Sequence, residues 1–151
     1  MNAYHYTESG LDNVIIEGLA VSVADDGEEV YHIPKVKLLH RAIAAGIVLH
    51  GAAVASKELR FLRTELGLTQ AELARIVHVD AQTVGRWERG ETPIPPVAEI
   101  VVRRLAVERL GLGEAPTIEE LSSRVVPTAR SEPIQIIADA ANDDQPYRLA
   151  A

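Results

Sequence analysis

The sequence predicts a mostly helical α+β protein with three parts. Extended β-branched runs and a turn signal lie before residue 34, which favours a small unit of a β-hairpin and a helix. Apolar residues then recur at helical spacing through residue 112, which favours a five-helix domain. Prolines interrupt the chain after residue 126, so a short C-terminal extension is expected to follow. The expected parts are 1–54, 55–113 and 114–151.

The N-terminal part has extended patterns over 14–16, 20–23 and 28–33. The turn-forming sequence Asp25-Asp26-Gly27 separates the last two and predicts a hairpin. Because two strands alone are marginal in water, we expect them to pack on the next segment. There the spacing predicts a helix over about 35–50, and Pro34 suits its first turn. Its inward face would consist of Val36, Leu39, Ile43, Ile47 and Val48.

The C-terminal part begins with a capping box from Thr117 to Glu120, which predicts a short helix to about residue 123. Residues 134–137 could form a late strand, and 139–145 have the composition of a polar loop. Residues 147–149 would be either tethered or frayed.

Composition excludes several classes of site and of protein. The chain has no cysteine, so it can form neither a disulfide nor a thiolate zinc site. We see no secretory signal and no apolar stretch near the ~20 residues that a membrane span needs. No hydrolase, metalloprotease or nucleotide-binding motif is present, so we expect no enzyme, no catalytic residue and no cofactor. We expect a soluble cytoplasmic protein without a membrane partner.

Charge is distributed unevenly along the chain, whose formal net charge is −7. The first and last parts each carry three basic and seven acidic side chains, whereas residues 55–113 carry nine basic and eight acidic ones. Binding to phosphate depends on local positive charge, so the acidic total does not exclude a nucleic-acid partner.

Residues 56–91 contain the signals of three short helices joined by tight turns. Ser56 is expected to cap the first helix, and Gly67 lies where a C-cap glycine belongs. Thr69 and Glu72 form a capping box that opens the second helix. The inward positions of these two helices would be Leu59, Leu62, Leu66, Leu73, Ala74 and Val77.

The turn before the third helix is His78-Val79-Asp80, with Val79 as its buried plug and Asp80 as the next cap. Val84 and Trp87 would carry the buried face of the third helix. Its outward residues would be Ala81, Gln82, Thr83, Gly85 and Arg86. Glutamine can pair with adenine, arginine with guanine, and a threonine methyl can contact thymine, so this face suits the major groove of DNA.

The string LTQAELARIVHVDAQTVGRWERG, residues 68–90, resembles the Cro/Xre, lambda-repressor-like helix-turn-helix family. The resemblance implies double-stranded DNA as partner and base contacts by Ala81, Gln82, Thr83 and Arg86. It also implies phosphate contacts by Gln70, with Lys57, Arg60, Arg63 and Arg89 as further candidates. His78 departs from the family because it occupies the turn position usually held by glycine.

Structural alternatives remain open for several of these residues. Glu72 is better explained as a helix cap than as a functional acid, and Trp87 and Phe61 as core residues. Arg63 or Arg75 could equally be a solvated or ion-paired helix residue. The helix after Pro95-Pro96 could be a dimer seam or fully intramolecular; its apolar residues are Val97, Ile100, Val101, Leu105 and Leu110.

The flanks suggest a second interpretation. The phrase YHYTESGLDNV and the later IP and LHRAIA resemble the N-terminal part of MqsA-type antitoxins and related regulators. The MqsA zinc ribbon needs paired cysteines, and scattered histidines do not replace them, so we expect no metal site. Three hypotheses follow: a dimeric repressor, an antitoxin whose other regions bind a protein toxin, and an effector-sensing regulator for which the sequence shows no pocket.

Overall fold

The computed structural model describes residues 3–50, 52–113, 116–124 and 133–150, and it is an α+β structure with six helices and two small sheets in that part of the chain. The strands and helices are β1 (Ala3–His5), β2 (Val14–Glu17), β3 (Ala20–Val23), β4 (Glu29–His32), α1 (Val36–Leu49), α2 (Ser56–Glu65), α3 (Gln70–Val77), α4 (Ala81–Glu88), α5 (Pro96–Leu110), α6 (Ile118–Arg124), β5 (Ile134–Ala138) and β6 (Tyr147–Leu149). Among the described residues, no helix is long and apolar enough to cross a membrane.

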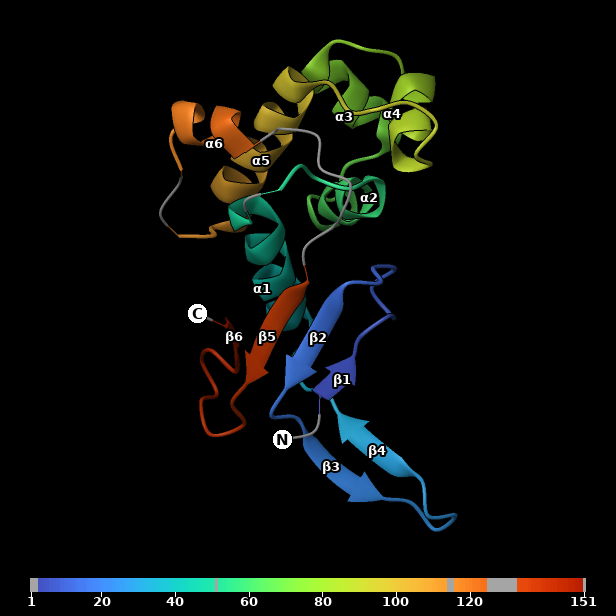
Figure 1. The fold of residues 1–151 in the computed structure, drawn as a ribbon, viewed down its shortest axis with the longest axis vertical. Coiled ribbons are helices and arrows are strands. Elements are labelled where there is room, and N and C mark those ends of the chain that lie inside the picture. The colour runs from blue at the N-terminus through green and yellow to red at the C-terminus, as the bar shows by residue number, and fades with distance from the viewer. Residues whose placement is uncertain (1–2, 51, 114–115, 125–132, 151) are drawn as a thin grey trace.

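The two ends of the chain form one four-stranded sheet, in the order β1-β2-β5-β6 (Figure 1). β2 and β5 are parallel, with Val14 opposite Ile134, and the two outer pairs are antiparallel. The predicted late strand is therefore confirmed, and residues 147–149 are tethered rather than frayed. The C-terminal extension thus supplies half of the sheet on which the N-terminal unit depends.

Helix α1 packs against this sheet through β5 and β6. Four of its five predicted inward residues are fully buried, but Val36, in the first turn, is 44% exposed. Gly46 permits the close approach, because a Cβ there would lie 2.8 Å from Cγ2 of Ile134. The predicted β3–β4 hairpin is confirmed, but it does not pack on α1 as expected, because the C-terminal strands occupy the apolar face of that helix.

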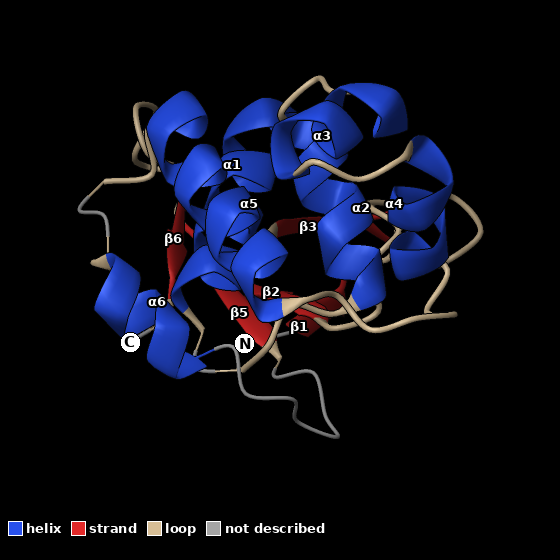
Figure 2. Ribbon diagram, turned by 90° about the horizontal axis from the view of Figure 1, so that it is seen from above, coloured by secondary structure: helices blue, strands red, loops and turns tan. Residues whose placement is uncertain are grey.

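The five helices α2 to α6 form the second part of the molecule, beyond the sheet and α1 (Figures 1 and 2). Four of them lie within residues 55–113, and the fifth, α6, follows and packs on α5 with Leu121 fully buried. One continuous apolar core joins the sheet, α1 and helices α2 to α5. On α5 the buried apolar residues are Ala98, Val102, Ala106 and Val107, whereas Val97, one of the apolar residues left open between a dimer seam and an intramolecular role, is 73% exposed.

The segment between α1 and α2 is held by a buried arginine. Arg103 of α5 is fully buried and donates to the carbonyls of Val48, at 3.2 Å, of His50, at 3.3 Å, and of Ala52. It also pairs with Glu99, one helical turn earlier, at 3.1 Å. The charge of Arg103 is therefore compensated inside the core, and its donors fix the connection between the two parts of the molecule.

Candidate nucleic-acid interface

The predicted capping box of Thr69 and Glu72 forms at the start of α3. The hydroxyl of Thr69 accepts from the backbone N–H of Glu72 at 3.1 Å, and the Glu72 carboxylate accepts from the backbone N–H of Thr69 at 3.2 Å. The hydrogen bond from that backbone N–H is the largest cause that lowers the pKa of Glu72. Glu72 therefore acts as a helix cap, the role favoured over a functional acid.

The first helix begins differently from the prediction. Ser56 is the first residue of α2, and Ala55 occupies the cap position. The carboxylate of Glu58, which is 1% exposed, accepts from the backbone N–H of Ala55 at 2.8 Å. It also lies within hydrogen-bond distance of the side chains of Asn13, at 3.2 Å, and His50, at 3.3 Å. An alanine cap is tolerated because this glutamate closes the helix end and ties it to the N-terminal unit.

The turn between α3 and α4 has the geometry that a glycine would favour. His78 is the C-cap of α3 with φ 60° and ψ 44°, in the left-handed region. The N–H of Val79 reaches back to the carbonyl of Ala74 at 2.9 Å, so the helix ends in a closed turn. Histidine therefore adopts the conformation despite its Cβ, and Val79 lies half-buried as the plug.

Asp80 caps α4 through two hydrogen bonds from Thr83. Its carboxylate accepts from the backbone N–H at 2.7 Å and from the hydroxyl at 2.8 Å. The side-chain hydrogen bond, followed by the backbone one, lowers the pKa of Asp80. Thr83 is thus held in one orientation at the start of the exposed helix, with its hydroxyl proton directed toward Asp80.

The outward face of α4 presents two polar side chains one helical turn apart. Gln82 and Arg86 are exposed, and within the described residues neither side chain makes a hydrogen bond. Ala81 and Thr83 are partly exposed beside them. Gly85 is buried and not outward as predicted, because the guanidinium of Arg89 and the amide of Gln70 cover it. A Cβ at that position would meet Nη1 of Arg89 at 2.9 Å.

A buried cluster fastens α4 to the two preceding helices. The guanidinium of Arg63 donates to the Glu88 carboxylate from Nε, at 2.6 Å, and from Nη2, at 3.0 Å, and Nη1 donates to the carbonyl of Leu68. The side-chain amide of Gln70 donates to the same carboxylate at 3.1 Å. Arg63 is therefore the ion-paired helix residue that the sequence left as an alternative, and a phosphate contact by it would require part of this cluster to open.

The remaining candidate cations lie at the surface. Lys57 pairs with Asp12 at 3.2 Å, and Arg89 pairs with Glu91 at 2.9 Å. All four side chains are more than half exposed, so either ion pair can exchange for a phosphate at small cost. Arg60 is exposed and its side chain makes no hydrogen bond within the described residues.

A second polar chain joins the N-terminal unit to α2, and no local pattern of residues predicts it. The ring of His40 lies 2.9 Å from the Tyr6 hydroxyl through Nε2 and 2.9 Å from the Glu65 carboxylate through Nδ1. The three residues come from separate elements, so only the tertiary fold brings them together. Across the described ranges, no group of three or more histidine and carboxylate side chains is arranged to hold a metal ion.

Comparison with known proteins bears on the helical part alone. Residues 59–109, about a third of the chain, match a family model described as helix-turn-helix, of the Cro/C1 type. This confirms the predicted family of the motif and its association with DNA. No curated protein and no solved structure gives a significant match.

Proposed function

We propose that this chain, which carries a Cro/Xre-type helix-turn-helix domain over residues 59–109, is a sequence-specific regulator that represses transcription by occupying an operator. The observation that carries the proposal is the outward face of α4. Gln82 and Arg86 are exposed, one turn apart and free to make new hydrogen bonds, on a helix fixed by Asp80 and by the Glu88 cluster. Such a rigid polar face suits base edges in the major groove.

Phosphate contacts would position this helix on the duplex. We assign them to Lys57, Arg60 and Arg89, whose exposed side chains lie on α2 and directly after α4, and to Gln70 at the start of α3. The N-terminal end of α3 also carries partial positive charge, which favours a phosphate beside Gln70. Ala81 and Thr83 would contact bases through their methyl groups.

The test is the Arg86→Ala variant, measured by fluorescence anisotropy on the chain's own promoter and on scrambled DNA. We expect a loss of about 1–3 kcal/mol on the cognate site, with relaxed preference at one base pair. Arg109→Ala serves as a control, because it removes the same charge from an exposed position at the end of α5. Equal binding of both DNAs by the Arg86 variant and the wild type would exclude the proposed base contact.

A second function is supported by the charge of the N-terminal unit. Residues 1–34 contain seven carboxylates and neither lysine nor arginine. Such a surface complements a basic protein, so we propose that the chain is also an antitoxin that binds a protein toxin outside the helix-turn-helix. The test is co-purification with the product of the neighbouring gene, and growth inhibition by that product alone that co-expression of this chain relieves. A neighbour that neither binds nor inhibits growth would exclude this function.

A further inference from the structure

The β3–β4 hairpin extends away from the rest of the molecule (Figure 1). Within the described residues its two strands pair only with each other, and every residue of both strands except Tyr31 is exposed. Val21, Val23 and Val30 are 38%, 71% and 42% exposed, although valine favours a covered strand. The ring of Tyr31 lies 4.8 Å from that of Tyr4 and anchors the hairpin at its base.

Such a hairpin has two free edges and little packing of its own. A two-stranded hairpin is marginal in water, and proteins usually protect exposed strand edges by covering them or by placing charge near them. Here the charge consists of four carboxylates, at residues 25, 26, 28 and 29, and it has one sign. A partner strand would gain the backbone hydrogen bonds of an edge, and on the face that carries Ala20 it would cover Val30.

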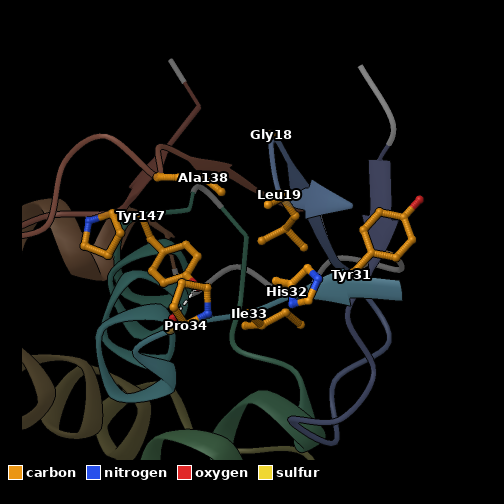
Figure 3. Close-up of a pocket in the computed structure, with 11 residues that line it drawn as sticks. Gly18, Leu19, Tyr31, His32, Ile33, Pro34, Ala138 and Tyr147 are labelled. Atoms are coloured by element: carbon orange, nitrogen blue, oxygen red, sulfur yellow. Dashed lines mark hydrogen bonds between the residues drawn. The ribbon is translucent and has the colours of Figure 1, made fainter. Parts of the chain in front are cut away.

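A pocket of about 390 Å³ opens at the base of the hairpin. Figure 3 shows Leu19, His32 and Ile33 on one side of it, with Ala138 and Tyr147 of the C-terminal strands on the other. The Tyr147 hydroxyl donates to the carbonyl of Pro34, which fixes one wall. The lining is mostly apolar and the volume lies within the range of ligand pockets, so it could accept an aliphatic or aromatic side chain.

Acidic segments lie on both sides of this pocket. The hairpin tip carries the four carboxylates already named, and the loop before β6 carries Asp139, Asp143 and Asp144. Two cations directly follow residues that line the pocket: Lys35, whose ammonium donates to the carbonyl of Asp143, and Arg148. The seven carboxylates outnumber them. A second copy of this chain would bring an identical acidic hairpin, so charge repulsion disfavours it as the occupant.

We propose that the hairpin and this pocket form the docking site for a basic, extended segment of a protein partner. The segment adds a strand to a free edge of the hairpin and inserts one apolar side chain into the pocket between Leu19, Ile33 and Tyr147. This inference rests on the proposed capture of a protein partner, and it is independent of DNA binding. Backbone pairing and the apolar anchor supply affinity, while the carboxylates select a basic sequence and speed its encounter.

The probe is an array of strand-forming octapeptides with one central leucine or phenylalanine, each made as a lysine/arginine version and a glutamate twin. Binding to the full chain is measured by fluorescence anisotropy at several salt concentrations, and the site is mapped by amide chemical shifts. We expect basic peptides to bind, to perturb residues 20–33 and 138–147, and to weaken as salt rises. The proposal is overturned if no basic peptide binds more tightly than its acidic twin, or if the perturbed amides lie outside residues 20–33 and 138–147.

A matched pair of variants tests whether the apolar side chain of the partner segment enters the pocket. Ala20 is exposed and lines the pocket, whereas Val21 is the next residue and points to the opposite face of the strand. Ala20→Trp should fill the pocket and weaken peptide binding at least tenfold, while Val21→Trp should leave it within about twofold. Equal effects of the two variants would refute the pocket as the anchor site.

A third variant tests how much the carboxylates contribute to peptide binding. The Asp143→Asn, Asp144→Asn double substitution should weaken binding about two- to tenfold and flatten its salt dependence. All variants should bind operator DNA as the wild type does, which also shows that they fold. If the product of the neighbouring gene co-purifies equally with Ala20→Trp and with the wild type, the proposed binding of a protein partner is retained. The proposed docking site is then wrong. Self-association of the chain through the hairpin would also overturn the proposal.

Discussion

Arg63 of α2 and Glu88 of α4 form an ion pair with two hydrogen bonds, at 2.6 and 3.0 Å, beneath the exposed face of α4. The Glu88 side chain is 3% exposed and that of Arg63 is 15% exposed, so solvent screens the pair little. The pair fixes the orientation of α4 relative to α2. The orientation of Gln82 and Arg86 therefore depends on a contact made on the opposite side of their helix.

Removing one partner of this ion pair should destabilise the fold strongly. Glu88→Ala leaves the guanidinium of Arg63 in place without its carboxylate, which costs about 3–5 kcal/mol for a buried pair. The measurement is urea unfolding at neutral pH. Glu91→Ala, which breaks the exposed pair with Arg89, should change the unfolding free energy little. Similar losses for both variants would mean that Glu88 has no special structural role.

Replacing His78 with glycine should stabilise the protein. The left-handed conformation at φ 60° is costly for a residue with a Cβ, and glycine removes that cost but loses more entropy on folding. We expect a net gain of about 0.5–1 kcal/mol and a higher Tm in thermal unfolding. His78→Ala keeps a Cβ and should show no such gain. If alanine stabilises as much as glycine, the imidazole and not the backbone is the source of strain.

The cap of α4 should make stability depend on pH in acid. Hydrogen bonds from Thr83 lower the pKa of Asp80 in the folded state. The stabilisation is therefore complete above the unfolded pKa of about 3.9, and it is lost as the pH falls through the lower, folded value. Asp80→Asn keeps a capping side chain that does not titrate in this range. It should lose less stability than the wild type between pH 7 and pH 3 in urea unfolding, and an equal loss would contradict the assignment.

The helix-turn-helix was predictable because its signals are local. Thr69, Glu72 and Asp80 cap their helices through residues three positions away, and the turn at His78 is closed within one stretch of chain. The hairpin was predictable for the same reason, since Asp-Asp-Gly marks its turn. In each case a few neighbouring residues determine the backbone, so no knowledge of the tertiary fold is needed.

The rest of the fold depends on contacts that no local pattern encodes. Ile134 pairs with Val14 across 120 positions, and that pairing decides what covers α1. On α5, the buried pair of Glu99 and Arg103 lies on the face that a hydrophobic pattern assigns to solvent, while Val97 is exposed. The Arg63–Glu88 pair could not be predicted either, because an arginine on a helix surface and an arginine in an ion pair occur in the same sequence pattern.

The exposed start of α5 makes a specific prediction about the dimer. We expect two copies to associate through this helix, since Val97 is 73% exposed and Val101, one turn later, is only partly covered. A two-fold dimer would place two α4 helices about 34 Å apart on an inverted repeat.

Val97→Asp is compatible with the first turn of a helix, so it should leave the monomer folded. It should weaken self-association at least tenfold in analytical ultracentrifugation, because each copy would bury an uncompensated carboxylate at the seam. Val23→Asp is the matched control, as Val23 is 71% exposed on the β3–β4 hairpin. A wild-type dimer constant for Val97→Asp, or an equal loss in both variants, would place the seam elsewhere.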